Sequence, residues 1–208
     1  MKRLAFEPLT PALWPALERL FGARGACGGC WCMWWRLSRA EWKKGKGASN
    51  RRAFRKIVEH GPPPGLLAFA GDEPIAWCAL APREEYELLV RSRSLKPVDD
   101  QPVWSITCFF VDKAWRRRGV SSALLEAAAK LARAQGARLL EGYPVDPRTN
   151  SMPDAFAWTG TLKAFERSGF REVARRSKTR PIVRRALAGR KTAPATSASS
   201  RAGPARSS

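Results

Sequence analysis

The sequence is poor in the side chains that most often carry proton-transfer chemistry. Its 208 residues include one histidine, His60, and two tyrosines, Tyr86 and Tyr143. It also lacks two familiar phosphate-binding motifs. No loop ends in Gly-Lys-Ser/Thr, as a Walker A loop does, and no three-glycine dinucleotide fingerprint is present. The motifs of P-loop and Rossmann nucleotide binding are therefore excluded.

Long hydrophobic runs are missing as well. No apolar stretch reaches the length of about 18 residues that a membrane helix needs, so we expect no membrane span and no membrane partner. Residues 1–10 lack the apolar centre of a signal peptide. Together with an odd number of cysteines, five, this predicts a cytoplasmic protein with unpaired thiols. The hydrophobic fraction of 44% nevertheless indicates a folded globular chain.

Acidic residues are scarce: 38 Lys and Arg face 18 Asp and Glu, a formal net charge of +20. From Arg171 onward there are 11 basic residues and one acid, Glu172, which leaves +10. The first 170 residues hold the other 27 basic and 17 acidic residues, also +10. Half of the excess charge therefore lies in the last fifth of the chain. A basic field attracts polyanions such as nucleic acid, membrane surfaces or cofactor phosphates.

Apolar periodicity and turn signals predict strands and helices along most of the chain. Strands are expected at residues 3–9, 66–70, 75–80, 103–111 and 139–143, with a final pair within 170–183. Helices are expected at 10–21, from Ser38 onward, and at 51–59, 84–93, 119–135 and 161–168, with a long loop at 144–160. Thr10 is placed as a helix cap, and Ser38 with Glu41 as a capping box. The predicted fold class is α/β of a mixed, α+β-like kind, with a mixed sheet and helices on both faces.

The composition changes near residue 186. From there the chain consists mainly of Ala, Ser, Gly, Pro, Thr and Arg and has almost no large apolar residue. Such a segment cannot bury enough surface to offset its ordering entropy. We therefore predict one domain over residues 1–185 and a disordered basic tail over residues 186–208.

The most informative segment is an apolar strand that runs through a basic turn directly into an amphipathic helix. The turn contains three consecutive arginines, and the helix opens with small residues at Gly119, Ser121 and Ser122. Unpaired amides and the positive end of the helix dipole make such a junction a natural anion site. A basic loop before a helix is also common without any ligand, so the pattern alone leaves both interpretations open.

Two motifs in this region resemble those of a known family. Arg116-x-x-Gly119-x-Ser121 resembles the pyrophosphate loop of the GNAT acetyltransferases, Arg/Gln-x-x-Gly-x-Gly/Ala. The hairpin at 66–80 is similar to the central hairpin of that family. The later segment that is similar to its second motif reads Ala164-Phe165-Glu166-Arg167-Ser168-Gly169-Phe170. The resemblance implies a GNAT fold, in which a twisted sheet of six to seven strands splays in a V.

The resemblance also implies a reaction: an acetyl group moves from acetyl-CoA to a primary amine by direct attack in a ternary complex. Acetyl-CoA would lie where the strand ending at Val111 splays from the strand beginning near Arg138. Backbone amides around Phe110 and Val111 would hold the pantetheine arm, and the loop would hold the pyrophosphate. No metal is expected. The implied cofactor-binding residues are Phe110, Val111, Arg116, Arg117, Arg118, Gly119, Val120, Ser121 and Ser122.

The usual catalytic groups of the family are absent. Many members have a tyrosine where this chain has Phe165, and many have a glutamate where it has Ser105. We therefore expect Tyr143 as the general acid and Glu141, on the same face of its strand, as the base. The alternatives are that Tyr143 packs on the core, that Glu141 is a surface carboxylate, or that a water relay replaces both; Glu84 and Glu85 are weaker candidates for the base.

A cysteine–tryptophan segment near the N-terminus is the most unusual local sequence. Cys27, Cys30 and Cys32 could supply zinc ligands, but no fourth ligand follows at finger spacing. The resemblance to the GNAT family implies that this segment lines the acceptor cleft, where aromatic rings can hold a cationic or flat acceptor. Packing of the same rings in the core is the alternative. The residues predicted to bind the acceptor are Trp31, Trp34, Trp35 and Arg36.

The acceptor can be a small molecule or a peptide, and the chain a monomer or a homodimer; the sequence leaves these open. A second function is also open. Without the usual acid and base, a degenerate GNAT-fold protein could bind coenzyme A, or nucleic acid through the basic tail, without turnover.

Overall fold

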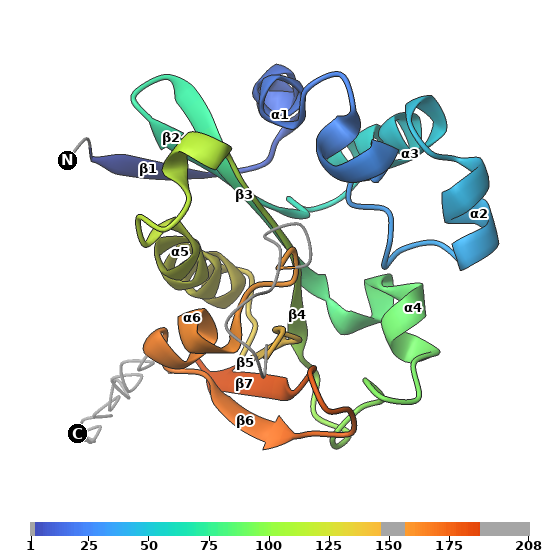
Figure 1. Cartoon of the computed structure of the whole chain (residues 1–208), viewed down its shortest axis with the longest axis vertical. Helices are drawn as coiled ribbons and strands as arrows, with labels where there is room; N and C mark the ends of the chain where they lie inside the picture. Colours follow the sequence, from blue (N-terminus) through green and yellow to red (C-terminus); the bar gives the residue numbers. More distant parts are fainter. Residues whose placement is uncertain (1–2, 147–156, 188–208) are drawn as a thin grey trace, which may run out of the picture.

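The computed structural model describes residues 3–146 and 157–187 and contains one seven-stranded sheet in the order β1-β2-β3-β4-β5-β7-β6 (Figure 1). Only β4 and β5 pair in parallel, so the sheet is mixed, as predicted. The strands are β1 (Leu4–Pro8), β2 (Gly65–Ala70), β3 (Glu73–Pro82), β4 (Trp104–Val111), β5 (Leu139–Gly142), β6 (Arg171–Ala174) and β7 (Ile182–Ala186). The α-helices are α1 (Trp14–Phe21), α2 (Arg39–Lys44), α3 (Ala48–His60), α4 (Glu87–Val90), α5 (Val120–Ala134) and α6 (Leu162–Arg167).

Helices cover both faces of the sheet, and the side-chain alternation of β2 and β3 shows why. Leu66, Ala68 and Ala70 belong to the core cluster that contains the apolar residues of α5. Leu67 and Phe69, between them in the sequence, belong to the cluster that contains α1 and α3. Because successive side chains of a strand point to opposite faces, a continuous apolar strand can bury both. The unbroken apolar sequence of β2 is therefore what a two-sided core requires.

The sheet opens in a V between β4 and β5. These two strands are paired only over Trp104 to Ile106 and Leu140 to Gly142. β4 then continues to Val111, while β5 ends at Gly142 and pairs on its other side with β7. The predicted splay is therefore present, and among the described residues no strand pairs with the outer edge of β4 from Thr107 onward.

Local sequence signals predicted most helices and strands correctly, and the structure corrects the boundaries of a few. The capping box of α2 is present, since the amide of Glu41 donates to Ser38 Oγ and the amide of Ser38 donates to the Glu41 carboxylate. Thr10 makes no side-chain cap; the chain first forms a 3-10 turn at Pro11–Leu13 and only then α1. The helix predicted at 51–59 begins earlier, at Ala48. The helix predicted at 84–93 is a 3-10 turn followed by the short α4.

The predicted tail begins within ordered structure. β7 extends to Ala186, and the amide of Leu187 donates to the carbonyl of Arg138 (2.9 Å). Residues 188–208 lie outside the described residues, as does most of the loop predicted at 144–160, so the predicted tail stays a prediction. Within the described part of the chain, no helix combines the length and apolarity needed to cross a bilayer.

Close packing of Gly142 against Phe165 yields a test of the core. A Cβ at Gly142 would lie 2.2 Å from the Phe165 ring, which is fully buried between Phe109 and Phe170. We expect Gly142→Ala to lower the free energy of unfolding by about 1–3 kcal/mol, measured by urea denaturation. In the Phe165→Leu background the same change should cost at least about 0.5 kcal/mol less, because the smaller side chain frees volume. Equal costs in both backgrounds would contradict this packing.

Candidate active site

The connection between β4 and α5 forms a basic corner. The Asp112 carboxylate accepts a hydrogen bond from the amide of Ala114 (2.8 Å), and Lys113–Trp115 form a single 3-10 turn. Arg117 and Gly119 then adopt left-handed backbone angles, with φ of 60° and 78°. Gly119 is the N-cap of α5, and this conformation favours glycine because it has no Cβ. The predicted Arg-x-x-Gly loop is therefore a tight reversal between strand and helix.

This corner exposes a row of hydrogen-bond donors. Within the described residues, the six consecutive amides of residues 117–122 have no acceptor. Ser122 Oγ is buried and also lacks a partner there. A Cβ at Gly119 would meet nothing within 4 Å, so the space before the helix is open. Donors, open space and the positive end of a 15-residue helix coincide, which is the arrangement that binds phosphate groups.

A cleft of about 400 Å³ runs from this corner along β4. Eight of the nine predicted cofactor residues line it: Phe110, Val111, Arg116, Arg117, Gly119, Val120, Ser121 and Ser122. The ninth, Arg118, instead places its guanidinium 5.5 Å from the ring centre of Trp115, another lining residue. The structure therefore brings the predicted residues together around one cavity, although their role in binding a cofactor stays a prediction.

The edge of β4 that faces away from β3 forms one wall of the cleft. The amide of Asp112 donates to Ile75 on β3 (2.9 Å), and hydrogen bonding alternates along an antiparallel strand. The amide of Phe110 is therefore turned toward β3, and the amide of Val111 toward the cleft. The amide of Phe109, on the same edge as Val111, donates to the carbonyl of Trp158 (2.6 Å). Arg116 Nε donates to the Val111 carbonyl (3.1 Å), which ties the basic corner to the strand.

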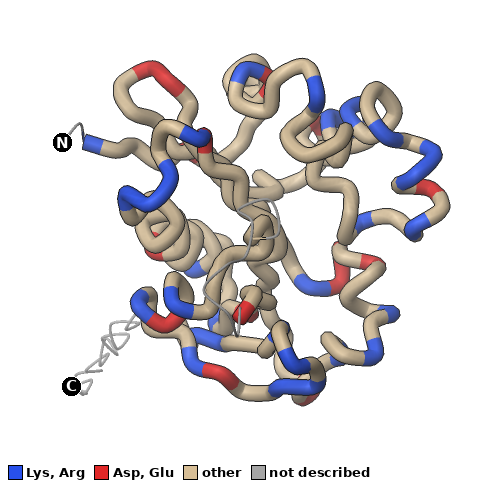
Figure 2. Tube along the Cα trace, in the orientation of Figure 1, with Lys and Arg blue, Asp and Glu red and all other residues tan. Residues whose placement is uncertain are grey.

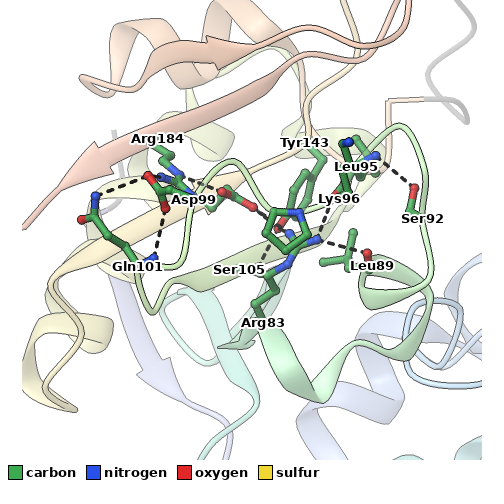
Figure 3. A network of polar contacts seen from close by, with 12 residues as sticks. Arg83, Leu89, Ser92, Leu95, Lys96, Asp99, Gln101, Ser105, Tyr143 and Arg184 are labelled. Carbon is green, nitrogen blue, oxygen red and sulfur yellow. Dashed lines mark hydrogen bonds and ion pairs between the residues drawn. The ribbon is translucent and has the colours of Figure 1, made fainter.

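Glu141 and Tyr143 lie together, as their spacing predicts, but in a buried network rather than in the cleft. The Tyr143 hydroxyl donates to Glu141 Oε1 (2.6 Å). The Glu141 carboxylate is fully buried between two arginines, with Arg83 Nη1 and Arg184 Nε each at 2.7 Å. Ser105 Oγ lies 2.8 Å from the Tyr143 hydroxyl, and Figure 3 shows Arg83, Ser105 and Tyr143 converging.

This burial bears on the predicted acid and base. A general base must come within hydrogen-bond reach of the proton that it takes, yet neither Glu141 nor Tyr143 lines the cleft. Burial, and next the Glu141 carboxylate, raise the pKa of Tyr143 well above its ordinary value, so its hydroxyl stays protonated and acts as a donor. The two catalytic assignments stay predictions that this geometry does not favour; the alternative of core packing describes Tyr143 better.

The positions of the usual family tyrosine and glutamate are also buried. Phe165 has no exposed surface and packs edge-on against Phe170 (ring centres 4.9 Å apart). Ser105 is equally buried. Among the described residues that line the cleft there is no carboxylate and no histidine. Proton removal by ordered water is therefore the alternative that fits this cleft.

The four predicted acceptor residues lie in different environments. Trp31 is buried and stacks on Trp14 (5.9 Å between ring centres), which is the core-packing alternative. Trp34 is half-buried and, like the buried Trp35, contacts Trp158 in the cleft wall, with ring centres 6.2 and 5.7 Å apart. The Arg36 side chain is 6% exposed and pairs with Glu85 at 2.6 Å. A direct acceptor contact is therefore most accessible to Trp34, and the acceptor assignment stays a prediction.

The cysteines of the same segment are all free thiols. Cys27 is exposed and lines the cleft, whereas Cys32 accepts a hydrogen bond from Trp77 Nε1 (3.0 Å) in the core. Burial, followed by the neighbouring Cys32, raises the pKa of Cys30 to about 11. In the described part of the chain, no three His, Cys, Asp or Glu side chains converge as metal ligands.

Sequence reasoning missed several residues of the site. Arg83 and Arg184 stand 101 positions apart and meet only at Glu141, so no local pattern marks them. The missed cleft residues include Cys27, Trp158, Thr161 and Arg167. Thr161 precedes α6 and Arg167 ends it. Arg167 lies within the segment similar to the family's second motif and Thr161 three residues before it, so this resemblance is the one signal that could have identified them.

Comparisons with known proteins agree with this architecture. The model of the acetyltransferase (GNAT) family matches residues 31–152, more than half of the chain. No curated protein matches. A structure described only as an acetyltransferase is 14% identical, with a TM-score of 0.56 over 88% of this chain and 100% of the other. A GNAT-family acetyltransferase of Desulfovibrio desulfuricans is 17% identical, with a TM-score of 0.50 over 89% and 100%.

A third structure, a PaiA N-acetyltransferase of Thermoplasma acidophilum solved with coenzyme A, is 15% identical over 88% of this chain and 98% of its own, with a TM-score of 0.47. At these identities the first two likenesses establish the fold, and the family match establishes membership. The chain belongs to the GNAT acetyltransferase family. The predicted family and fold are both confirmed.

The buried position of Glu141 gives a test of its role. We expect Glu141→Gln to lower the free energy of unfolding by about 3–5 kcal/mol, because it leaves the buried Arg83 without a countercharge and leaves Arg184 with Asp99 alone. Tyr143→Phe should cost less, about 1–3 kcal/mol, since it removes only hydrogen bonds. Both are measured by chemical denaturation at pH 7. If Glu141→Gln kept full stability and lost only turnover, Glu141 would be the catalytic base after all.

The buried thiol and phenol groups predict alkaline sensitivity. Burial raises the pKa of Cys30 to about 11 and that of Tyr86 to about 12. Between about pH 9 and 12 the unfolded chain has therefore lost protons that the folded chain retains. The free energy of unfolding should fall as pH rises, by about 1.4 kcal/mol per pH unit for each group. Tyr86→Phe should make the decline shallower above about pH 10; an unchanged slope would contradict the assignment.

Proposed function

We propose that the protein transfers an acetyl group from acetyl-CoA to a primary amine by direct attack in a ternary complex. One observation carries the proposal: the amides of residues 117–122 at the head of α5 have no acceptor among the described residues, and five of these six residues line the same cleft as the edge of β4 that β5 leaves uncovered. Acetyl-CoA carries a diphosphate, which needs the free amides, and an extended arm that contains amides, which needs the strand edge. The two features must therefore lie side by side. Family membership supplies the reaction class.

The corner suits the diphosphate of coenzyme A. The amides of residues 117–122 can each donate to a phosphate oxygen, and Arg116 and Arg117 line the same cavity. Charge-assisted hydrogen bonds of this kind are about twice as strong as neutral ones. The small residues Gly119, Ser121 and Ser122 let the backbone approach the ligand closely. These residues would hold the cofactor and set its position along β4.

The strand edge suits the reacting end. Acetyl-CoA, when bound, supplies a thioester that an amine can attack. The Val111 amide, the free donor on the edge of β4, can donate to an oxygen that gains negative charge, and the splay keeps other strands away from it. With no carboxylate or histidine among the described lining residues, the protein contributes mainly positioning, and water removes the proton of the amine.

The acceptor enters, in this proposal, beside Ala26, Cys27 and Trp158, which line the cleft. Trp34 contacts Trp158 edge-on, and the Arg180 guanidinium lies 6.0 Å from the Trp158 ring centre. An aromatic wall can hold an amine through cation–π contact before it loses its proton. The identity of the amine is left to a substrate screen.

A second candidate, a binding protein without turnover, is favoured by the burial of Phe165 and Ser105 at the usual catalytic positions. The two functions differ in one assay. The enzyme should release free thiol from acetyl-CoA faster in the presence of some amine from a panel of amino acids, polyamines, aminoglycosides and peptide N-termini. Binding of coenzyme A without any amine-dependent release would favour the second candidate.

A carboxylate at the head of α5 should disrupt cofactor binding. We expect Gly119→Glu to weaken the binding of coenzyme A at least tenfold, ~1.4 kcal/mol, because the added charge repels the diphosphate and occupies its donors. Isothermal titration calorimetry measures the affinity.

Two variants control for strain and charge. Gly119→Ala keeps the backbone strain without the charge, and Gly136→Glu adds the same charge past the far end of α5, also at a positive φ, 88°. Both should bind coenzyme A more tightly than Gly119→Glu. A loss as large in Gly136→Glu would show that the effect does not arise at the corner.

A further inference from the structure

The proposed function does not use the basic surface on α2 and α3. Between Arg39 and Lys56 there are eight Lys and Arg residues and one acid, Glu41. All eight basic residues are exposed, and Figure 2 shows how closely basic positions follow one another along α2 and α3. We define the α2–α3 basic surface by these residues: Arg39, Lys43, Lys44, Lys46, Arg51, Arg52, Arg55 and Lys56.

Most of this charge is uncompensated. Arg51 pairs with Glu18, and Arg55 with Glu59. The Glu41 carboxylate is engaged by Ser38 at the start of α2. In the described ranges, the other six basic side chains have no ion pair. Six like charges on two short helices destabilise the fold by mutual repulsion, and a polyanionic ligand would relieve that repulsion.

We propose that the α2–α3 basic surface binds nucleic acid. Two partly exposed tryptophans lie among its cations: Lys46 Nζ is 4.5 Å from the ring centre of Trp42, and Arg39 Cζ is 5.2 Å from that of Trp34. Proteins bind single-stranded nucleic acid with cations that follow its phosphate backbone and with aromatic rings on which its bases stack. Trp34 also contacts Trp158 beside the cleft, but the basic residues of this surface take no part in the proposed transfer.

The chemistry of the surface distinguishes nucleic acid from other anionic partners. Insertion into a membrane surface needs an apolar helix face, but Phe54 and Val58, the apolar residues of α3, are 1% and 3% exposed. A protein interface needs an apolar centre. Within the described residues the exposed large hydrophobic side chains are Val90 and Val173, and neither lies on α2 or α3. A polar, strongly positive surface is typical of a nucleic-acid interface.

The surface is also held rigidly beside the cleft. The amide of Gly47 and the Asn50 side chain both donate to the carbonyl of Gly29, at 3.0 and 3.3 Å. A Cβ at Gly29 would lie 2.5 Å from the Gly47 nitrogen, so the two segments pack backbone to backbone. The Gly29 segment also supplies Ala26 and Cys27 to the cleft. A nucleic acid on this surface would therefore lie next to the entrance proposed for the acceptor.

The test measures binding of a fluorescein-labelled single-stranded RNA of about 20 nucleotides by the full-length protein, between about 50 and 200 mM salt. In the test variant, Lys43, Lys44, Arg52 and Lys56 are all replaced by Gln. These exposed residues have no ion pair in the described ranges, so the fold should keep its stability. The slope of log affinity against log salt should become shallower by about 2–3, since each lost phosphate contact removes about 0.7.

Matched controls separate this surface from net charge. One replaces four exposed basic residues of α5, α6 and β6, namely Lys130, Arg133, Lys163 and Arg171, with Gln. The other replaces Arg190, Lys191, Arg201 and Arg206, beyond the described residues. Each should change the slope by less than about 1. An equal change in either control, or an unchanged slope in the test variant, would overturn the proposal. So would binding of polyglutamate or phosphatidylserine vesicles at least as tightly as RNA.

Discussion

The buried carboxylate of Glu141 is the contact on which the shape of the sheet depends. It lies at the middle of the short parallel ladder between β4 and β5, opposite Ser105. Its two oxygens bind Arg83, at the end of β3, and Arg184, on β7, while Tyr143 connects it to Ser105 on β4. Four strands are therefore joined at the point of the V. A charge buried in this way is costly unless all its partners are present, which makes the arrangement specific.

Arg83 extends the same network to the loop before β4. Its Nη2 donates to the carbonyls of Leu89 and Leu95, at 3.1 and 2.5 Å. Arg184 adds Asp99 from that loop, at 2.7 Å. The segment between β3 and β4 is thus fixed to the closed end of the sheet, and the strands diverge beyond it. The open edge of β4 begins where this ladder stops.

In the proposed function, the cleft combines a phosphate-binding corner made of backbone amides with a reacting end that lacks the usual side chains of the family. Backbone amides form the corner, so it tolerates changes of side chain as long as Gly119 and its small neighbours are kept. The usual acid and base of the family are single side chains. At their positions this chain has Phe165 and Ser105, which lie in the packed interior. Membership of the family therefore says more about what the cleft holds than about how protons move in it.

The sequence by itself determined the strands, the main helices, the capping box at Ser38 and the Arg116-x-x-Gly119 corner. Each depends on neighbours within a few residues: side-chain alternation, cap chemistry, or the need for glycine at a positive φ.

The tertiary structure decided which polar residues are accessible. Glu141 and Tyr143 share a face because of their spacing, but their burial depends on Arg83 and Arg184, whose approach follows from strand order. Likewise, Trp31 and Trp34 lie three positions apart in one segment, yet Trp31 is buried against Trp14 and Trp34 is half-buried. Burial depends on contacts between residues far apart in the sequence, and no local pattern encodes them.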